Sequence, residues 1–194
     1  LDEDDVRALI AGLDRDQLQR LDLSENPGGQ ALGQVLLGDP WTRLRRLALR
    51  QCGLAPDFAV LLAGHLPALD RLYLDGNPLG DATCAALSSA QIALQKLSLR
   101  GCGVTARGLA PLSLAGPRLS ELQVLDLSEN PLGESAGAAL TAALAAAPVQ
   151  WLSLADCGLS ASTLRGLFSA PVAGRLRDLD LSGNPLGAAP VLAE

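Results

Sequence analysis

Leucines and polar residues alternate in short groups that recur along the whole chain. Each group follows the pattern L-x-x-L-x-L-x-x-N/C, with Val149 in place of the first leucine in one copy, and successive copies begin 25 to 28 residues apart. In the L-x-L part every second position is apolar, which is the period of a strand with one buried face. Seven copies in one register predict a repeat protein with one short strand per repeat. The copies begin at residues 18, 44, 69, 94, 122, 149 and 176 and close at Asn26, Cys52, Asn77, Cys102, Asn130, Cys157 and Asn184.

The segments between these groups predict helices that return the chain to the start of the next strand. Proline or glycine follows each closing Asn or Cys and ends the strand. Residues 1–13 predict an amphipathic helix that belongs to a preceding repeat or a cap. Further helices are expected over 29–38, 56–65, 80–90, 105–115, 134–146 and 160–169, the fourth of which contains Pro111 and so loses a helical hydrogen bond.

This pattern resembles the leucine-rich repeat. Long copies with strictly alternating Asn and Cys are similar to the ribonuclease-inhibitor-like type, which also occurs in innate-immune sensors, Ran GTPase-activating proteins and Tonsoku-like scaffolds. The resemblance implies an α/β fold, a curved solenoid or horseshoe of about seven repeats. Its parallel β-sheet would line the concave face and its helices the convex face. Such proteins share a fold and not a function, so function must be argued from the site. We expect residues 1–194 to form a single leucine-rich repeat domain, a piece of a longer protein.

Charge and cysteine spacing restrict the possible partners and the cellular compartment. The net charge is −6, which argues against unspecific attraction to nucleic acid or to an anionic membrane. No apolar run approaches the roughly 20 residues that cross a bilayer. Cys52, Cys102 and Cys157 lie two repeats apart, so their separation is roughly 10 Å, beyond the ~7 Å between Cα atoms that a disulfide allows. With Cys84 as an apolar filler, this usage predicts an intracellular, cytoplasmic or nuclear, protein with free thiols.

The side chains beside the core leucines are expected to face the uncovered side of the sheet. There, the first four strands carry six basic and two acidic residues, and the last three carry three acidic and no basic residues. A column of like charges opposes its own stability, and aromatic residues with arginine often anchor interfaces. The alternative is a solvated face in which Asp22 and Asp75 neutralise neighbouring arginines. The predicted partner-binding residues are Arg20, Arg46, Arg50, Arg71, Tyr73, Lys96, Arg100 and Trp151.

Catalysis has little support in the sequence. His65 is the only histidine, Lys96 is the only lysine, and no phosphate-binding loop or clustered zinc-ligand spacing occurs. We therefore predict no enzyme activity, cofactor, metal or small-molecule substrate. The predicted function is a scaffold that binds a protein partner, through an acidic segment, on the concave face. Two alternatives remain open: nucleic-acid binding along the Arg/Lys column, and a GTPase-activating scaffold suggested by the resemblance alone.

Overall fold

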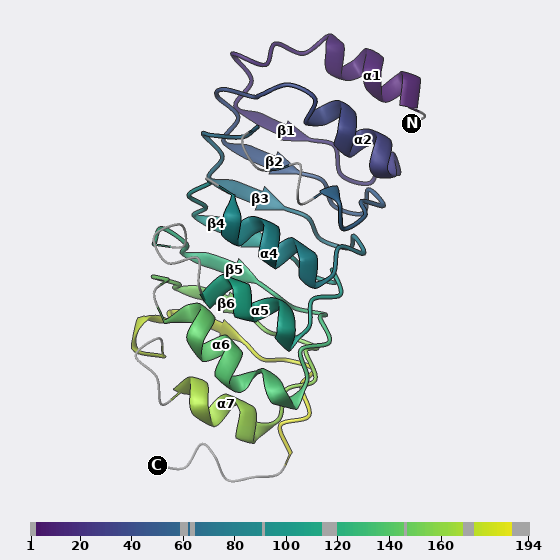
Figure 1. Cartoon of the computed structure of the whole chain (residues 1–194). Helices are drawn as coiled ribbons and strands as arrows, with labels where there is room; N and C mark the ends of the chain where they lie inside the picture. Colours follow the sequence, from purple (N-terminus) through teal and green to yellow (C-terminus); the bar gives the residue numbers. More distant parts are fainter. Residues whose placement is uncertain are drawn as a thin grey trace.

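Seven short parallel strands form one sheet, and they follow one another in chain order (Figure 1). The computed structural model describes residues 3–58, 62, 65–90, 92–113, 120–145, 147–168 and 173–187. Each strand pairs with the next so that its central leucine faces the equivalent leucine, as the repeat pattern predicts. The strands are β1 (Arg20–Asp22), β2 (Arg46–Ala48), β3 (Arg71–Tyr73), β4 (Lys96–Ser98), β5 (Val124–Asp126), β6 (Trp151–Ser153) and β7 (Asp178–Asp180).

The helices stack on one side of this sheet, each beside the next, and leave the other side uncovered (Figure 1). Their bounds agree with the predictions to within a few residues, except that the segment predicted over 134–146 begins as a 3-10 turn. Pro111 lies inside its helix without ending it. Most of the helix predicted over 56–65 lies outside the described residues. The helices are α1 (Glu3–Ala11), α2 (Gly29–Leu36), α4 (Asp81–Ser89), α5 (Ala106–Ser113), η2 (Glu134–Ala136), α6 (Gly137–Leu144), α7 (Ala161–Phe168) and η3 (Ala173–Arg175).

The core is a continuous row of leucines between the sheet and the helices. Leu47, Leu72 and Leu152 are fully buried, because each lies between two neighbouring repeats. Leu21 in the first strand is 8% exposed, and Leu179 in the last is only partly buried. Burial of each repeat therefore depends on its neighbours, as expected for a solenoid.

The closing asparagines join successive repeats through their side-chain amides. The Oδ1 atom of Asn130 accepts hydrogen bonds from the backbone N–H groups of Cys102 (3.1 Å) and Val104 (2.9 Å) in the preceding repeat. Its Nδ2 donates to the carbonyls of Leu99 (2.7 Å) and Leu127 (2.9 Å). Asn77 and Asn184 repeat this arrangement. Each of these asparagines thus satisfies buried backbone groups of two repeats at once.

The closing cysteines make a simpler link in the intervening repeats. The thiol of Cys102 donates to the carbonyl of Leu74 in the preceding repeat (3.2 Å). Cys52 and Cys157 do the same with Leu23 (3.2 Å) and Leu127 (3.1 Å). The strict alternation has a physical reason. The asparagine oxygen satisfies the N–H groups around each cysteine, and the thiol satisfies a carbonyl of each asparagine repeat.

The residue before each closing Asn or Cys has a left-handed backbone conformation. Glycine adopts positive φ at no steric cost, whereas other residues pay on the order of 1 kcal/mol. Three repeats use glycine here, and four use Glu, Gln or Asp. The seven positions are Glu25, Gln51, Gly76, Gly101, Glu129, Asp156 and Gly183, with φ between 50° and 70°. A side chain at this turn lies at the edge of the uncovered face, where it can contribute to a binding site.

The four cysteines are free thiols and all are buried. Burial raises the pKa of Cys84 and of Cys102 to about 12, and that of Cys157 to about 11. We therefore expect almost no reaction with a thiol reagent at pH 8 in the folded protein, and four thiols after unfolding. The unfolded state loses these protons first as the pH rises above about 9, so the free energy of unfolding should fall between about pH 9 and 12. Titration with a chromogenic disulfide, before and after denaturant, counts the reactive thiols, and denaturant unfolding at a series of pH values follows the free energy of unfolding. Recovery of only two thiols after unfolding would contradict it.

Candidate functional site

The uncovered side of the sheet, here called the concave face, consists of side chains in columns that run across the strands. In the first column Arg20, Arg46, Arg71 and Lys96 occupy paired positions on β1 to β4. Neighbouring strands lie about 4.8 Å apart. Four cations therefore stand side by side, which is the arrangement that the sequence predicts.

Tyr73 lies at the centre of the basic region but does not present its ring to solvent. The side-chain cations of Arg46, Arg50 and Lys96 lie 4.9, 4.4 and 5.2 Å from its ring centroid. Cation–π attraction holds positive groups at this distance over an aromatic ring. Only 7% of Tyr73 is exposed as a result. Tyr73 therefore gathers cations, and its own ring is not a stacking surface.

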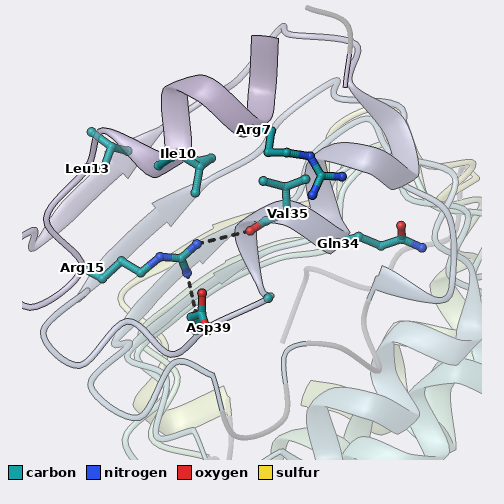
Figure 2. A pocket seen from close by; sticks show the side chains of 9 residues that line it. Arg7, Ile10, Leu13, Arg15, Gln34, Val35 and Asp39 are labelled. Carbon is teal, nitrogen blue, oxygen red and sulfur yellow. Dashed lines mark hydrogen bonds between the residues drawn. The ribbon is translucent and has the colours of Figure 1, made fainter. Parts of the chain in front are cut away.

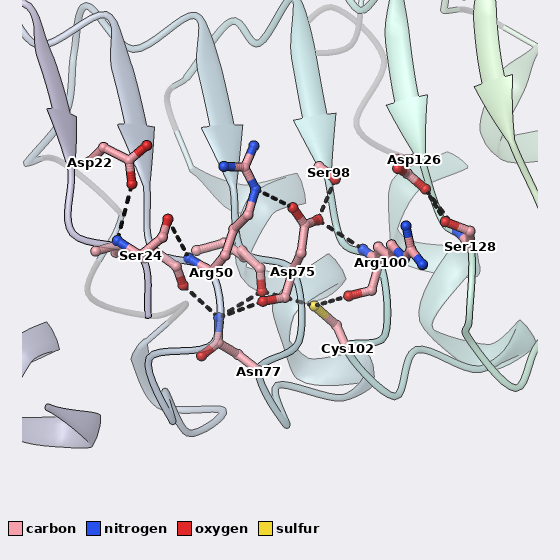
Figure 3. A network of polar contacts seen from close by, with 12 residues as sticks. Asp22, Ser24, Arg50, Asp75, Asn77, Ser98, Arg100, Cys102, Asp126 and Ser128 are labelled. Carbon is pink, nitrogen blue, oxygen red and sulfur yellow. Dashed lines mark hydrogen bonds and ion pairs between the residues drawn. The ribbon is translucent and has the colours of Figure 1, made fainter. Parts of the chain in front are cut away.

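Asp75 is the centre of a polar network between β2 and β4 (Figure 3). One carboxylate oxygen accepts the Nε–H of Arg50 at 2.7 Å. The other accepts the hydroxyl of Ser98 and the backbone N–H of Arg100 at 3.2 Å. This pairing of Asp75 with a neighbouring arginine is the one expected for the alternative of a solvated face. Arg50 is therefore already neutralised.

Arg100 is neutralised by a residue that the sequence analysis did not single out. Its Nη2 donates to Glu129 Oε1 at 2.5 Å. This hydrogen bond raises the pKa of Arg100 and lowers the pKa of Glu129. Glu129 holds one of the left-handed turn positions, φ 57°, in the next repeat. A non-glycine residue at a position that favours glycine was the available signal for it.

Of the six cations on the concave face, three have no ion pair among the described residues: Arg20, Arg46 and Lys96. Arg71 has a long contact of 3.5 Å with Asp70, whose other oxygen lies 3.5 Å from Arg45. Asp22 lies close by. Burial raises its pKa, but hydrogen bonds from Ser24 and the charges of Arg50 and Arg46 outweigh this and lower it. The basic column is therefore neutralised in part and keeps uncompensated charge at β1, β2 and β4.

A hollow of about 500 Å³ opens on the concave face between β2 and β6. Five of the eight predicted partner-binding residues line it, namely Arg50, Tyr73, Lys96, Arg100 and Trp151, together with Asp75, Asp126 and Glu129. Arg20, Arg46 and Arg71 lie on the same face outside the hollow. The hollow thus contains the two paired arginines, Arg50 and Arg100, and the unpaired Lys96, and the unpaired Arg20 and Arg46 lie outside it on the same face.

The opposite end of the concave face is acidic. Asp178 and Asp180 of β7 are exposed. Hydrogen bonds from the backbone and the hydroxyl of Ser182 lower the pKa of Asp180, which keeps this carboxylate ionised at neutral pH. Between the two charged ends, Val124 and Trp151 continue the first column as two partly exposed apolar side chains. The column is therefore basic, then apolar, then acidic.

A second hollow of about 700 Å³, between α1 and α2, has a structural explanation (Figure 2). Arg15 donates to the carbonyls of Val35 (3.3 Å), Leu36 (3.2 Å) and Asp39 (2.6 Å), at the end of α2. Its guanidinium also lies 4.7 Å from the ring centroid of Trp41. Trp41 is fully buried, with its indole N–H bonded to the Leu36 carbonyl. These bonds satisfy the helix end.

In the described part of the chain, no helix is long and apolar enough to span a bilayer.

Comparison with known proteins agrees with the repeat architecture. A family model for the leucine-rich repeat matches residues 93–113. Ribonuclease inhibitor from Mus musculus is 33% identical over 189 residues, which cover 91% of this chain and 41% of that protein. Ribonuclease inhibitor from Sus scrofa is 34% identical over 163 residues, covering 79% and 36%. Tonsoku-like protein from Mus musculus is 39% identical over 161 residues, covering 76% and 11%. The chain thus spans less than half the length of these relatives.

Proposed function

Because the chain belongs to the leucine-rich repeat family, in its ribonuclease-inhibitor-like type, we propose that it is a non-catalytic scaffold that binds a protein partner on its concave face. We further propose that the contacted part of the partner is an acidic segment. The observation that carries this proposal is the in-register column of Arg20, Arg46, Arg71 and Lys96. An acidic segment would neutralise cations that otherwise repel one another across neighbouring strands.

The internal ion pairs sharpen the proposed contact. Arg50 and Arg100 are held by Asp75 and Glu129, so a partner would have to displace these carboxylates to engage them. Arg20, Arg46 and Lys96 need no such exchange. We therefore place the contact on these three cations, with the ion-paired Arg50 and Arg100 beside them.

Nucleic-acid binding along the same column is a weaker proposal. Binding of single strands depends on bases that stack on exposed aromatic rings. The ring of Tyr73 is covered by cations, which leaves the partly exposed Trp151 as the aromatic residue of this face on which a base could stack. The net charge of −6 adds long-range repulsion. A GTPase-activating role gains nothing from the geometry of the site, since it rests on the family resemblance alone. We also propose an intracellular location, because buried free thiols and this family type fit a reducing compartment.

Reversal of two unpaired cations tests the proposed contact. We expect Arg46→Glu with Lys96→Glu to weaken binding of an acidic peptide by at least about tenfold, because attraction is replaced by repulsion. A fluorescein-labelled oligoglutamate is the probe, followed by anisotropy at about 50 mM salt, where screening is weak. Neither side chain belongs to the leucine core, but both lie over the Tyr73 ring. Loss of two cation–π contacts, each worth about 0.5–1 kcal/mol, should lower the free energy of unfolding by about 1–2 kcal/mol without unfolding the protein.

The matched control makes the same change of charge away from the concave face. Arg43→Glu with Arg107→Glu replaces two exposed arginines of a loop and of α5, and affinity should remain within a few-fold. Equal loss in both variants would mean that only net charge matters, and the proposal would be wrong. A single-stranded oligonucleotide forms the second arm. If it binds more tightly than the peptide, with a steep dependence on salt, the nucleic-acid proposal replaces this one.

A further inference from the structure

The order of chemistry along the first column of the concave face restricts the partner beyond its acidity. The column begins with Arg20, Arg46, Arg71 and Lys96, continues with Val124 and Trp151, and ends at Asp178. Asp180 stands beside Asp178 in the same strand and is exposed as well. The charge of this column therefore changes sign once, across an apolar step. A uniformly acidic segment would match the first part and be repelled by the last.

We infer that the partner segment is itself ordered as acidic, then apolar, then basic, and lies across the strands along the solenoid axis. The acidic part meets the cations of β1, β2 and β4. The apolar part contacts Val124 and Trp151, and the basic part meets Asp178 and Asp180. This inference rests on the proposed function, because it assumes that the concave face binds a protein segment.

Geometry sets the length of the segment. Seven strands about 4.8 Å apart span about 29 Å. An extended chain advances about 3.3 Å per residue, so about nine residues cover the column. At about 1.5 residues per strand, the four cationic positions take about five of these residues, the apolar step about two, and the acidic end the last one or two. A short linear segment is therefore sufficient.

The paired charges in the hollow explain why a partner segment can recognise the order of charges along the column. Arg50 with Asp75 and Arg100 with Glu129 are neutral units beside the column. They add little net charge, so the sign of the field along the column is set by the unpaired residues. Asp126 and Asp180 each accept hydrogen bonds from the backbone and hydroxyl of the serine two residues later, but Asp126 is partly buried and Asp180 is exposed. Among the strand residues of β5 to β7, the exposed carboxylates are thus Asp178 and Asp180 of β7.

Three capped nine-residue peptides test the inference. The first has five glutamates, two leucines and two lysines in that order, and the second has serines in place of the lysines. The third has the composition of the first with the lysines placed among the glutamates. We expect the first to bind about 5- to 20-fold more tightly than either of the others at about 50 mM salt, as expected for up to two exposed ion pairs.

Reversal at the acidic end identifies where the basic part lies. Asp178→Lys with Asp180→Lys should reduce binding of the first peptide to the level of the second and leave the second unchanged or stronger. The matched control, Asp4→Lys with Glu121→Lys, makes the same change of charge at exposed residues outside the column and should preserve the preference. Binding should also change the fluorescence of the partly exposed Trp151, and Trp151→Phe should remove that change.

The outcomes separate this inference from the proposed function. If the first two peptides bind equally, and both bindings are lost in Arg46→Glu with Lys96→Glu, the acidic contact stands and the ordered partner is wrong. Equal weakening of the first two peptides by the β7 reversal would also overturn the inference. If no peptide binds, the proposed acidic contact fails, and the ordered partner fails with it.

Discussion

Replacing Asn130 with alanine is expected to lower the free energy of unfolding by about 2–5 kcal/mol. The substitution strands the backbone N–H groups of Cys102 and Val104 and the carbonyl of Leu99, all near a buried side chain that is 1% exposed. Each buried polar group that loses its partner costs about 1–3 kcal/mol, with partial relief from water or relaxation. Urea denaturation followed by circular dichroism measures the change.

Asn26 provides the control within the same chain. It occupies the equivalent turn, but among the described residues its amide donates to two carbonyls of its own repeat, those of Leu23 and Ser24, both at 3.1 Å. Asn26→Ala should therefore cost no more than about 1 kcal/mol. Equal losses for both variants would show that the turn itself, and not the link between repeats, provides the stability.

Leu125→Ala is expected to destabilise the protein by a similar amount, about 2–5 kcal/mol. Leu125 is the central leucine of β5 and is 3% exposed. It faces Leu140 and Leu144 of α6 around a narrow apolar gap that is already present between sheet and helix. Strands on both sides hold this region in place, so the cavity left by the substitution cannot close fully.

The equivalent change at the end of the solenoid should have a smaller effect. Within the described residues, Leu179 of β7 has one neighbouring strand, β6, and is partly buried. We expect Leu179→Ala to cost less than half as much as Leu125→Ala, because less apolar area is lost from the core. A loss below about 1 kcal/mol for Leu125→Ala would place this residue outside the core and contradict the observed strand register.

The architecture could be predicted from the sequence because each repeat obeys the same local rule. Leu21, Leu72 and Leu125 stand at equal distances from the closing Asn, so a single strand assignment fixes all of them. Repeats also stack in chain order, which leaves no topology to choose. The helix predicted over 134–146 begins instead as the 3-10 turn η2 at Glu134, a local detail that leucine spacing does not encode.

The candidate site was less predictable, since it depends on contacts between residues of different columns. The side chains at Arg20, Arg46, Arg71 and Lys96 could be aligned by strand alternation alone. The ion pair of Arg100 could not be predicted, because Glu129 reaches this arginine from a left-handed turn of the next repeat. Nor could the burial of Tyr73, since Arg46 approaches it from one strand and Lys96 from another.

The alternation of asparagine and cysteine has a consequence for how such chains grow or shrink. A repeat that ends in Asn supplies an oxygen to the Cys repeat before it, and a repeat that ends in Cys supplies a thiol to the Asn repeat before it. Removal of one repeat would place two repeats of the same kind side by side, whereas removal of two would restore both links. A pair of repeats is therefore the smallest unit that can be added or removed while both kinds of link are kept. Gene duplications and deletions that preserve its stability should occur in steps of about 50 residues, and a shortened version made in the laboratory should be cut in the same steps.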